Sequence, residues 1–207
     1  MNINKPDIDT IIFDLGGVLI DWNPEYVYCQ LIADVKERKH FFDNICTHEW
    51  NEEQDAGRSL QEATDLLIAQ FPDYTELIQA YYGRWEEMLK GSITETVDIL
   101  NEIKNSSYFR LYALTNWSHE TFHVALERYD FLHWFEGIVV SGEEKTRKPF
   151  PEIYQTLLER YKVNPENALF IDDNFRNIEG AQAVGIQTIH FQSPAQLRQE
   201  LKKLLIL

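Results

Sequence analysis

Cysteine and basic residues are both scarce in this chain of 207 residues. The two cysteines, Cys29 and Cys46, are too few for a disulfide framework and form no CxxC metal motif. We therefore expect a protein of a reducing compartment, the cytoplasm. An apolar run at Ile11–Ile20 is interrupted by Asp14 and is far too short to span a bilayer. The N-terminus also lacks the basic start and apolar core of a secretory signal, so no membrane partner is expected.

Positive charge is outweighed by negative charge along the chain. The 19 Lys and Arg residues stand against 34 Asp and Glu residues, which gives a formal net charge of −15. A charge of this sign repels phosphate backbones and argues against broad binding to DNA or RNA. A small phosphorylated metabolite stays compatible where a local cation or a bound metal reverses the field. The hydrophobic fraction of 44% excludes a disordered chain, and monomer or small homo-oligomer stays open.

Short apolar segments rich in β-branched and aromatic residues predict five buried strands. Helical patterns lie between the last four segments and continue to the end of the chain, beginning at Pro151, after Asn174 and at Pro194. Strands that alternate with helices predict an α/β fold, a Rossmann-like, mainly parallel sheet with helices on both faces. The predicted strands are Thr10–Asp14, Phe109–Thr115, Gly137–Ser141, Ala168–Asp172 and Ile186–Phe191.

The stretch between the first two predicted strands has a different character. It contains no convincing strand and shows helical runs at Glu62–Phe71 and Asp73–Lys90. We interpret residues 22–90 as a helical cap domain inserted into an α/β core formed by residues 1–21 and 91–207. A cap that follows the first strand lies at the carboxyl end of the sheet, where open α/β sheets bind ligands.

Carboxylates follow two of the predicted strands. Asp14 ends the first strand and is followed by Gly16 and Gly17, which let the backbone approach a ligand closely. A carboxylate in this place serves as a nucleophile, a metal ligand or a simple turn cap. Asp172 and Asp173 end the fourth strand, and two adjacent acids repel one another unless a cation neutralises them. Such a pair is typical of a Mg²⁺ site, although the helix dipole also favours Asp at a helix N-terminus.

A hydroxyl and an amide follow the second predicted strand. Thr115 and Asn116 could bind phosphoryl oxygens at the same sheet edge. Taken alone, these residues or Ser118 are better explained as caps of the following helix.

A cation follows the third predicted strand. Lys148 stands just before the helix that begins at Pro151, where it could neutralise a phosphoryl group and an aspartate together. Lys145 and Arg147 lie beside it, and spacing alone does not choose among the three cations.

These groups occur in the chain order Asp, Thr-Asn, Lys, Asp-Asp, each after a different strand. In this order and placement the sequence resembles the haloacid dehalogenase superfamily of hydrolases, over essentially the whole chain. The resemblance implies that Asp14 is the nucleophile, Thr115 the phosphate-binding hydroxyl, Lys148 the motif-three lysine and Asp173 the metal-binding acid. Asp172 occupies the position before it, where some members carry a second acid.

More narrowly, the segments DLGGVLIDWNP, EWNEEQDAGRSL, KPFPEIY and IDDNFRNIEGA resemble the branch that includes α-D-glucose-1-phosphate phosphatases. This likeness implies hydrolysis of a small, sugar phosphate-like phosphomonoester through an aspartyl-phosphate. It also implies Mg²⁺ bound by Asp14, Asp173, the backbone carbonyl of Gly16 and, as a further ligand, Asp172. Thr115, Asn116 and Lys148 are then expected to hold the phosphoryl oxygens.

Gly16 departs from the pattern, because most phosphatases of the family carry there an Asp that serves as general acid and base. The departure keeps a metal-free 2-haloacid dehalogenase with the same nucleophile as an alternative, and a non-catalytic protein that kept the fold as another. Asp21 or a cap residue could supply the missing acid. Without any such acid, we expect anomeric, acyl or aryl phosphates to react faster than primary alkyl ones.

Overall fold

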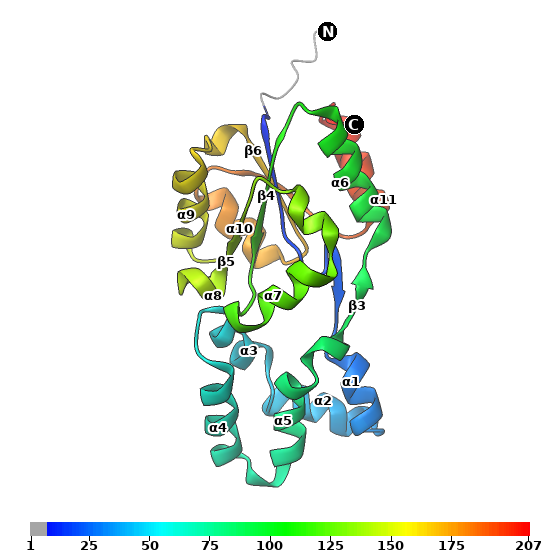
Figure 1. Ribbon diagram of the computed structural model, residues 1–207, viewed down its shortest axis with the longest axis vertical. Coiled ribbons are helices and arrows are strands. Elements are labelled where there is room, and N and C mark those ends of the chain that lie inside the picture. Colours follow the sequence, from blue (N-terminus) through cyan, green and yellow to red (C-terminus); the bar gives the residue numbers. More distant parts are fainter. Residues whose placement is uncertain (1–7) are drawn as a thin grey trace.

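The centre of the molecule is a five-stranded parallel sheet with the order β5-β4-β1-β6-β7 (Figure 1). The computed structural model describes residues 8–207. All five predicted strands form, and four of them are one or two residues shorter than predicted. They are β1 (Thr10–Phe13), β4 (Arg110–Thr115), β5 (Gly137–Val140), β6 (Ala168–Asp172) and β7 (Gln187–His190).

Helices cover both faces of this sheet because its side chains alternate between two apolar layers. Phe13 packs in one layer with Leu100 of α6 and Leu201 of α11. Its neighbour Ile12 points the other way, into a layer with Tyr154 of α9. These helices are α6 (Thr94–Ser106), α7 (His119–Arg128), α8 (Ser141–Glu144), α9 (Pro151–Tyr161), α10 (Phe175–Ala183) and α11 (Pro194–Lys203).

The residues at the ends of the core helices explain where these helices begin and end. Pro151 is the first residue of α9, where its missing N–H costs nothing. Asn174 and Ser193 cap α10 and α11 with side-chain oxygens. The predicted final helix was too long, because α11 ends at Lys203 and Leu205 adopts a left-handed φ of 57°.

A second group of helices lies beyond the carboxyl ends of the strands, at the lower end of Figure 1. Their buried side chains continue the larger apolar layer of the sheet. Within residues 8–207, none of the helices combines the length and the apolar character that crossing a membrane requires. The group comprises α1 (Glu25–Leu31), α2 (Val35–Asn44), α3 (His48–Asp55), α4 (Leu60–Gln70) and α5 (Thr75–Gly83), with 3₁₀ turns at Pro72–Tyr74 and Trp85–Met88.

Two short strands connect this helical group to the sheet, and the sequence did not predict them. β2 (Ile20–Trp22) pairs antiparallel with β3 (Leu89–Ser92), so the prediction that residues 22–90 hold no strand is wrong. The predicted continuous helix Asp73–Lys90 is also wrong, since α5 ends at Gly83. Strands of three and four residues are too short for a periodic pattern, and their pairing partner is remote in sequence.

The packing of α8 against the loop after β4 can be tested by a substitution, because the two segments are in tight contact. A Cβ atom on Gly142 would lie 2.5 Å from the backbone nitrogen of His119, whereas a Cβ on Gly83 would meet no atom within 4 Å. We expect Gly142→Ala to lower the free energy of unfolding by about 1–3 kcal/mol, because backbone must move. The control Gly83→Ala should leave it unchanged or raise it by up to about 1 kcal/mol. Equal urea midpoints for Gly142→Ala and the wild type would contradict this contact.

Candidate active site

The register of the sheet brings the predicted chemical groups to one edge. Phe13 of β1 lies opposite Ala113 of β4 and Ile171 of β6. The next residue, Asp14, donates its backbone N–H to the carbonyl of Ile171 at 2.9 Å. Because the strands are parallel, the residues that follow them share this edge, on the side of α1–α5.

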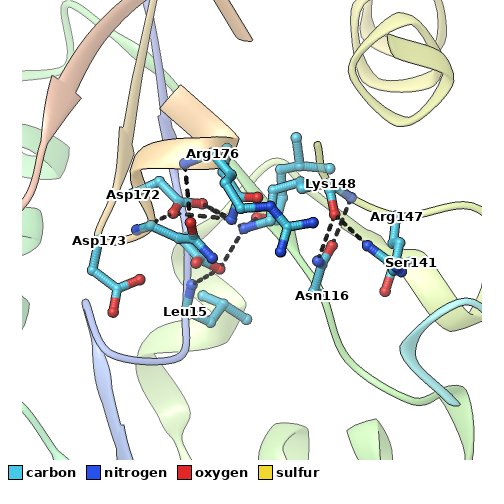
Figure 2. A network of polar contacts seen from close by, with 12 residues as sticks. Leu15, Asn116, Ser141, Arg147, Lys148, Asp172, Asp173 and Arg176 are labelled. Atoms are coloured by element: carbon cyan, nitrogen blue, oxygen red, sulfur yellow. Dashed lines mark hydrogen bonds and ion pairs between the residues drawn. The ribbon is translucent and has the colours of Figure 1, made fainter. Parts of the chain in front are cut away.

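The ammonium group of Lys148 is the centre of the polar network at this edge (Figure 2). It lies 2.9 Å from Oδ1 of Asp14 and 2.7 Å from Oδ2 of Asp172, and it donates to the carbonyl of Leu114 at 3.0 Å. The side chain is fully buried. Burial alone would lower the pKa of Lys148, but the two carboxylates outweigh it and raise the pKa above its ordinary value. The lysine is therefore charged.

The structure distinguishes the three neighbouring cations that the sequence left open. Lys145 is exposed at the surface. Arg147 points toward α3 and pairs with Glu52 at 2.9 Å. Among the three, Lys148 alone contacts the sheet-edge carboxylates.

Asp14 is anchored through one of its two carboxylate oxygens. Its Oδ1 accepts from the backbone N–H of Leu15 at 2.7 Å and from Lys148. Burial raises the pKa of Asp14 well above its ordinary value, and Asp172 and Asp173 add to this effect against the opposing charge of Lys148. An ionised Asp14 therefore requires more positive charge than Lys148 supplies.

The two adjacent acids face in different directions. Asp172 is fully buried and accepts from the backbone N–H of Asn174 at 2.7 Å and the side-chain amide of Asn177 at 3.1 Å. Asp173 is exposed, and Figure 2 shows its carboxylate turned away from the network. Oxygen atoms from Asp14, Asp172 and Asp173 nevertheless lie within 4.8 Å of one another. Three carboxylates this close fit a divalent cation with oxygen ligands.

The two glycines after Asp14 play different roles. Gly17 has a φ of +73°, which favours glycine, and a Cβ there would lie 2.3 Å from Oδ2 of Asp173, so a larger residue would displace this carboxylate. Gly16 has no such requirement, because a Cβ there would meet no atom within 4 Å. Both glycines line the cavity described below.

The polar side chains at the end of β4 and just after it make different contacts. The buried hydroxyl of Thr115 has no hydrogen-bond partner within residues 8–207, but Thr115 is not among the residues that line the cavity described below. Asn116 binds the backbone of Lys148 twice: its Oδ1 accepts from the N–H at 2.8 Å and its Nδ2 donates to the carbonyl at 3.0 Å. Ser118 caps α7 by accepting from the N–H of Glu120. The capping role therefore belongs to Ser118, and the Asn116 amide holds the lysine segment.

A cavity of about 320 Å³ lies between this edge and the helical group. Its walls combine carboxylates, amides and indole rings, an arrangement that suits a small ligand with a polar head and a ring or apolar body. The sequence did not single out most of the residues from the helical group, because no periodic pattern marks a side chain that faces a cavity. The cavity residues that it missed include Trp22, His48, Asn51, Glu52, Asp55 and Trp117.

Ion pairs of the buried carboxylate Glu52 hold α3 against the sheet edge. Glu52 of α3 pairs with Arg147 at 2.9 Å and with Arg176 of α10 at 3.4 Å. Just beyond α3, Gly57 lies so close to the carbonyl oxygen of Gly142 that an added Cβ would be 3.1 Å from it. The cavity is therefore covered by α3 in this structure.

Lys148 is expected to stabilise the metal-free fold by neutralising Asp14 and Asp172. We expect Lys148→Met to lower the free energy of unfolding by about 3–5 kcal/mol at pH 7 in chelator, because two buried carboxylates lose their cation. Burial and the neighbouring acids raise the pKa of Asp14. A carboxyl group with a raised pKa contributes its stability to the fold below the unfolded pKa and loses that contribution as pH rises, so the loss in Lys148→Met should shrink at pH 5.

Urea unfolding at the two pH values measures this effect. The control is Lys36→Met, which removes an exposed cation of α2 and should change stability by less than about 0.5 kcal/mol. An equal loss for Lys148→Met at both pH values would argue against charge compensation as its cause.

Known proteins are similar to this chain in both sequence and fold. It is 28% identical over 194 residues to the sesquiterpene phosphatase astK of Aspergillus oryzae, and the alignment covers 93% of this chain and 94% of that protein. It is 28% identical over 189 residues to the pyrophosphatase PpaX of Bacillus pumilus, covering 90% and 84%. The fold matches an HAD family enzyme of Bacteroides thetaiotaomicron in complex with magnesium and inorganic phosphate, with a TM-score of 0.64, 23% identity and coverage of 90% and 95%.

The order of the motifs, the sheet topology and the lysine-centred carboxylate cluster thus agree with one family. A family model described as haloacid dehalogenase-like hydrolase matches residues 8–185, which is most of the chain. The protein is a member of the haloacid dehalogenase-like hydrolases.

Proposed function

We propose that this protein is a Mg²⁺-dependent phosphatase that hydrolyses a small, sugar phosphate-like phosphomonoester. The observation that carries the proposal is the set of three carboxylates within 4.8 Å, next to a buried lysine and at the wall of a cavity. Phosphoryl transfer uses such a set, because catalysis of this reaction rests on positioning and charge neutralisation. The phosphatase names of two relatives give further support.

The acidic cluster suits a magnesium ion. Asp14, Asp173 and the backbone carbonyl of Gly16 would hold it, with Asp172 as a further carboxylate beside them. When bound, the ion would neutralise the carboxylates and polarise the phosphoryl oxygens. The exposed carboxylate of Asp173 and the buried cluster behind it fit this role, since Mg²⁺ keeps part of its water shell.

The chain's own residues supply the remaining steps. Asp14 attacks phosphorus, the bond to the leaving oxygen breaks, and an aspartyl-phosphate forms that water then hydrolyses. The unpartnered hydroxyl of Thr115 holds a phosphoryl oxygen. The ammonium of Lys148 already donates to Asp14, Asp172 and a backbone carbonyl, and it contributes positive charge beside the phosphoryl group. Asn116, expected from the sequence to bind phosphate, contributes by fixing the backbone of Lys148. The covering helix α3 limits water while the intermediate forms.

The alternative reaction is 2-haloacid dehalogenation, in which Asp14 would attack carbon without a metal. Gly16 favours it, because that reaction needs no proton donor at this position. The exposed Asp173 argues against it, since a metal-free enzyme gains nothing from a further carboxylate beside its nucleophile.

Metal dependence separates the two reactions. We expect phosphate release from a panel of phosphorylated metabolites with Mg²⁺, loss of release in chelator, and recovery when Mg²⁺ is restored, because the carboxylate cluster repels a phosphate dianion. Calorimetry should show Mg²⁺ binding that Asp173→Asn weakens. Chloride release from a 2-chloro acid at full rate in chelator would instead establish the dehalogenase.

The nucleophile is tested by Asp14→Asn, which keeps the shape of the side chain and removes the attacking charge. We expect turnover to fall by about 10³-fold or more. The control is Asp9→Asn, which changes an exposed acid just before the same strand and should keep wild-type turnover. Activity that persists in Asp14→Asn would show that another group attacks.

A further inference from the structure

A proton donor for the leaving group is missing beside the nucleophile. A Cβ on Gly16 would meet no atom within 4 Å, so the place of the usual acid is open cavity. Asp21, the nearby acid that the sequence left as an option, accepts a hydrogen bond from the hydroxyl of Tyr26 at 2.9 Å. Among the described residues, it is not part of the cavity wall.

The cavity wall itself contains four acids, and three of them have other roles. Asp14 is the proposed nucleophile and Asp173 a proposed metal ligand. Glu52 is held in ion pairs with Arg147 and Arg176. The fourth acid is Asp55, the last residue of α3. It has no ion-pair partner within residues 8–207.

A chain of hydrogen bonds within the helical group orients the Asp55 carboxyl. The hydroxyl of Tyr82 donates to Oδ1 of Asn51 at 3.0 Å, which directs the Asn51 amide nitrogen toward Asp55. That nitrogen lies 3.4 Å from Oδ2 of Asp55, four residues along the same helix. Gln54 donates to the Tyr82 hydroxyl at 2.8 Å and so completes the chain. Oδ1 of Asp55 receives no hydrogen bond from the described residues.

We propose that Asp55 is the general acid of this enzyme and protonates the leaving group from the cap, in place of an acid at Gly16. This proposal rests on the proposed phosphatase function. It makes proton delivery depend on closure, because α3 is held over the sheet edge by Glu52 and its two arginines.

The surroundings of Asp55 bring the pKa of its carboxyl group close to neutral pH, so part of it stays protonated there. Burial, together with the neighbouring charge of Glu52, raises the pKa of Asp55 to about 7, against the opposing charges of Arg147 and Lys148. A general acid is most effective when its pKa lies near the working pH.

The reaction balances with Asp55 as the proton carrier. Asp14 forms a bond to phosphorus, the bond from phosphorus to the leaving oxygen breaks, and that oxygen takes the Asp55 proton to become an alcohol. In the second step the water oxygen bonds to phosphorus, the bond between phosphorus and the Asp14 oxygen breaks, and Asp55, now a carboxylate, accepts a proton from this water. Inorganic phosphate leaves, and both aspartates return to their starting states.

The first test needs the wild type alone and compares two leaving groups. p-Nitrophenolate leaves without a proton, whereas a primary alkoxide requires one. We expect the ratio of kcat/KM for an alkyl phosphate to that for p-nitrophenyl phosphate to fall as pH rises through about 7, where Asp55 ionises. Titrations common to both substrates cancel in this ratio. A ratio that stays constant across this range would overturn the proposal.

The second test compares Asp55→Asn with the control Asp65→Asn. Asp65 is an exposed acid of α4 that accepts from the amide of Gln61, also four residues away, so the two changes are matched. We expect Asp55→Asn to lower kcat/KM for alkyl phosphates by about 10²–10⁴-fold and to leave p-nitrophenyl phosphate nearly unchanged. The preference for good leaving groups expected from Gly16 should therefore be strongest in this variant. Asp65→Asn should match the wild type on both substrates.

Other outcomes distinguish the two proposals. An equal loss on both substrates in Asp55→Asn would assign Asp55 a structural role and overturn its role as an acid. A selective alkyl loss in His48→Gln instead would place the acid at His48, which also lines the cavity. If the wild type releases no phosphate even from p-nitrophenyl phosphate with Mg²⁺, the phosphatase function itself fails.

An independent readout is the titration of the carboxyl carbon by ¹³C NMR. A resonance that titrates near pH 7 and is missing in Asp55→Asn supports the assignment. A titration near the ordinary pKa of Asp would contradict it.

Discussion

The ion pairs of Lys148 with Asp14 and Asp172 are the interaction on which the rest of the site depends. Two strands of the sheet end in buried carboxylates, and burying them is costly without a cation between them. Lys148 reaches both from a different loop, and its third hydrogen bond, to the carbonyl of Leu114, ties it to a third strand. The proposed nucleophile is therefore oriented by contacts that also hold three neighbouring strands in place.

Much of the core could be predicted from the sequence, because buried parallel strands are continuous apolar segments. Asp14 and Asp172 stand out as charges at the ends of such segments, and parallel topology alone brings them to one edge. Residue spacing could not choose Lys148 over Lys145 and Arg147, since the choice depends on the path of a loop, and only the family resemblance pointed to Lys148. The hydroxyl of Thr115 has no hydrogen-bond partner within residues 8–207 and the carboxylate of Asp173 is exposed, and their roles as phosphate and metal ligands stay predictions of the family resemblance.

The helical group was harder to predict in detail. Its helices are short and carry aromatic side chains on several faces, so their bounds do not follow from periodicity. Asp55 gives no signal in the sequence, because its interest comes from the cavity and from the contacts of Asn51 and Tyr82. Residues of this kind are recognised only when segments distant in the chain are seen together.

Arg147 and Lys148 are adjacent in the chain, yet they serve different parts of the molecule. Arg147 binds Glu52 on the covering helix, and Lys148 binds Asp14 at the sheet edge. The amide of Asn116 binds both the backbone N–H and the backbone carbonyl of Lys148. A displacement of α3 would therefore be transmitted through the Arg147–Glu52 ion pair to the segment that sets the position of the Lys148 ammonium group. Opening of the cavity and the placement of this buried charge would in this way be coupled.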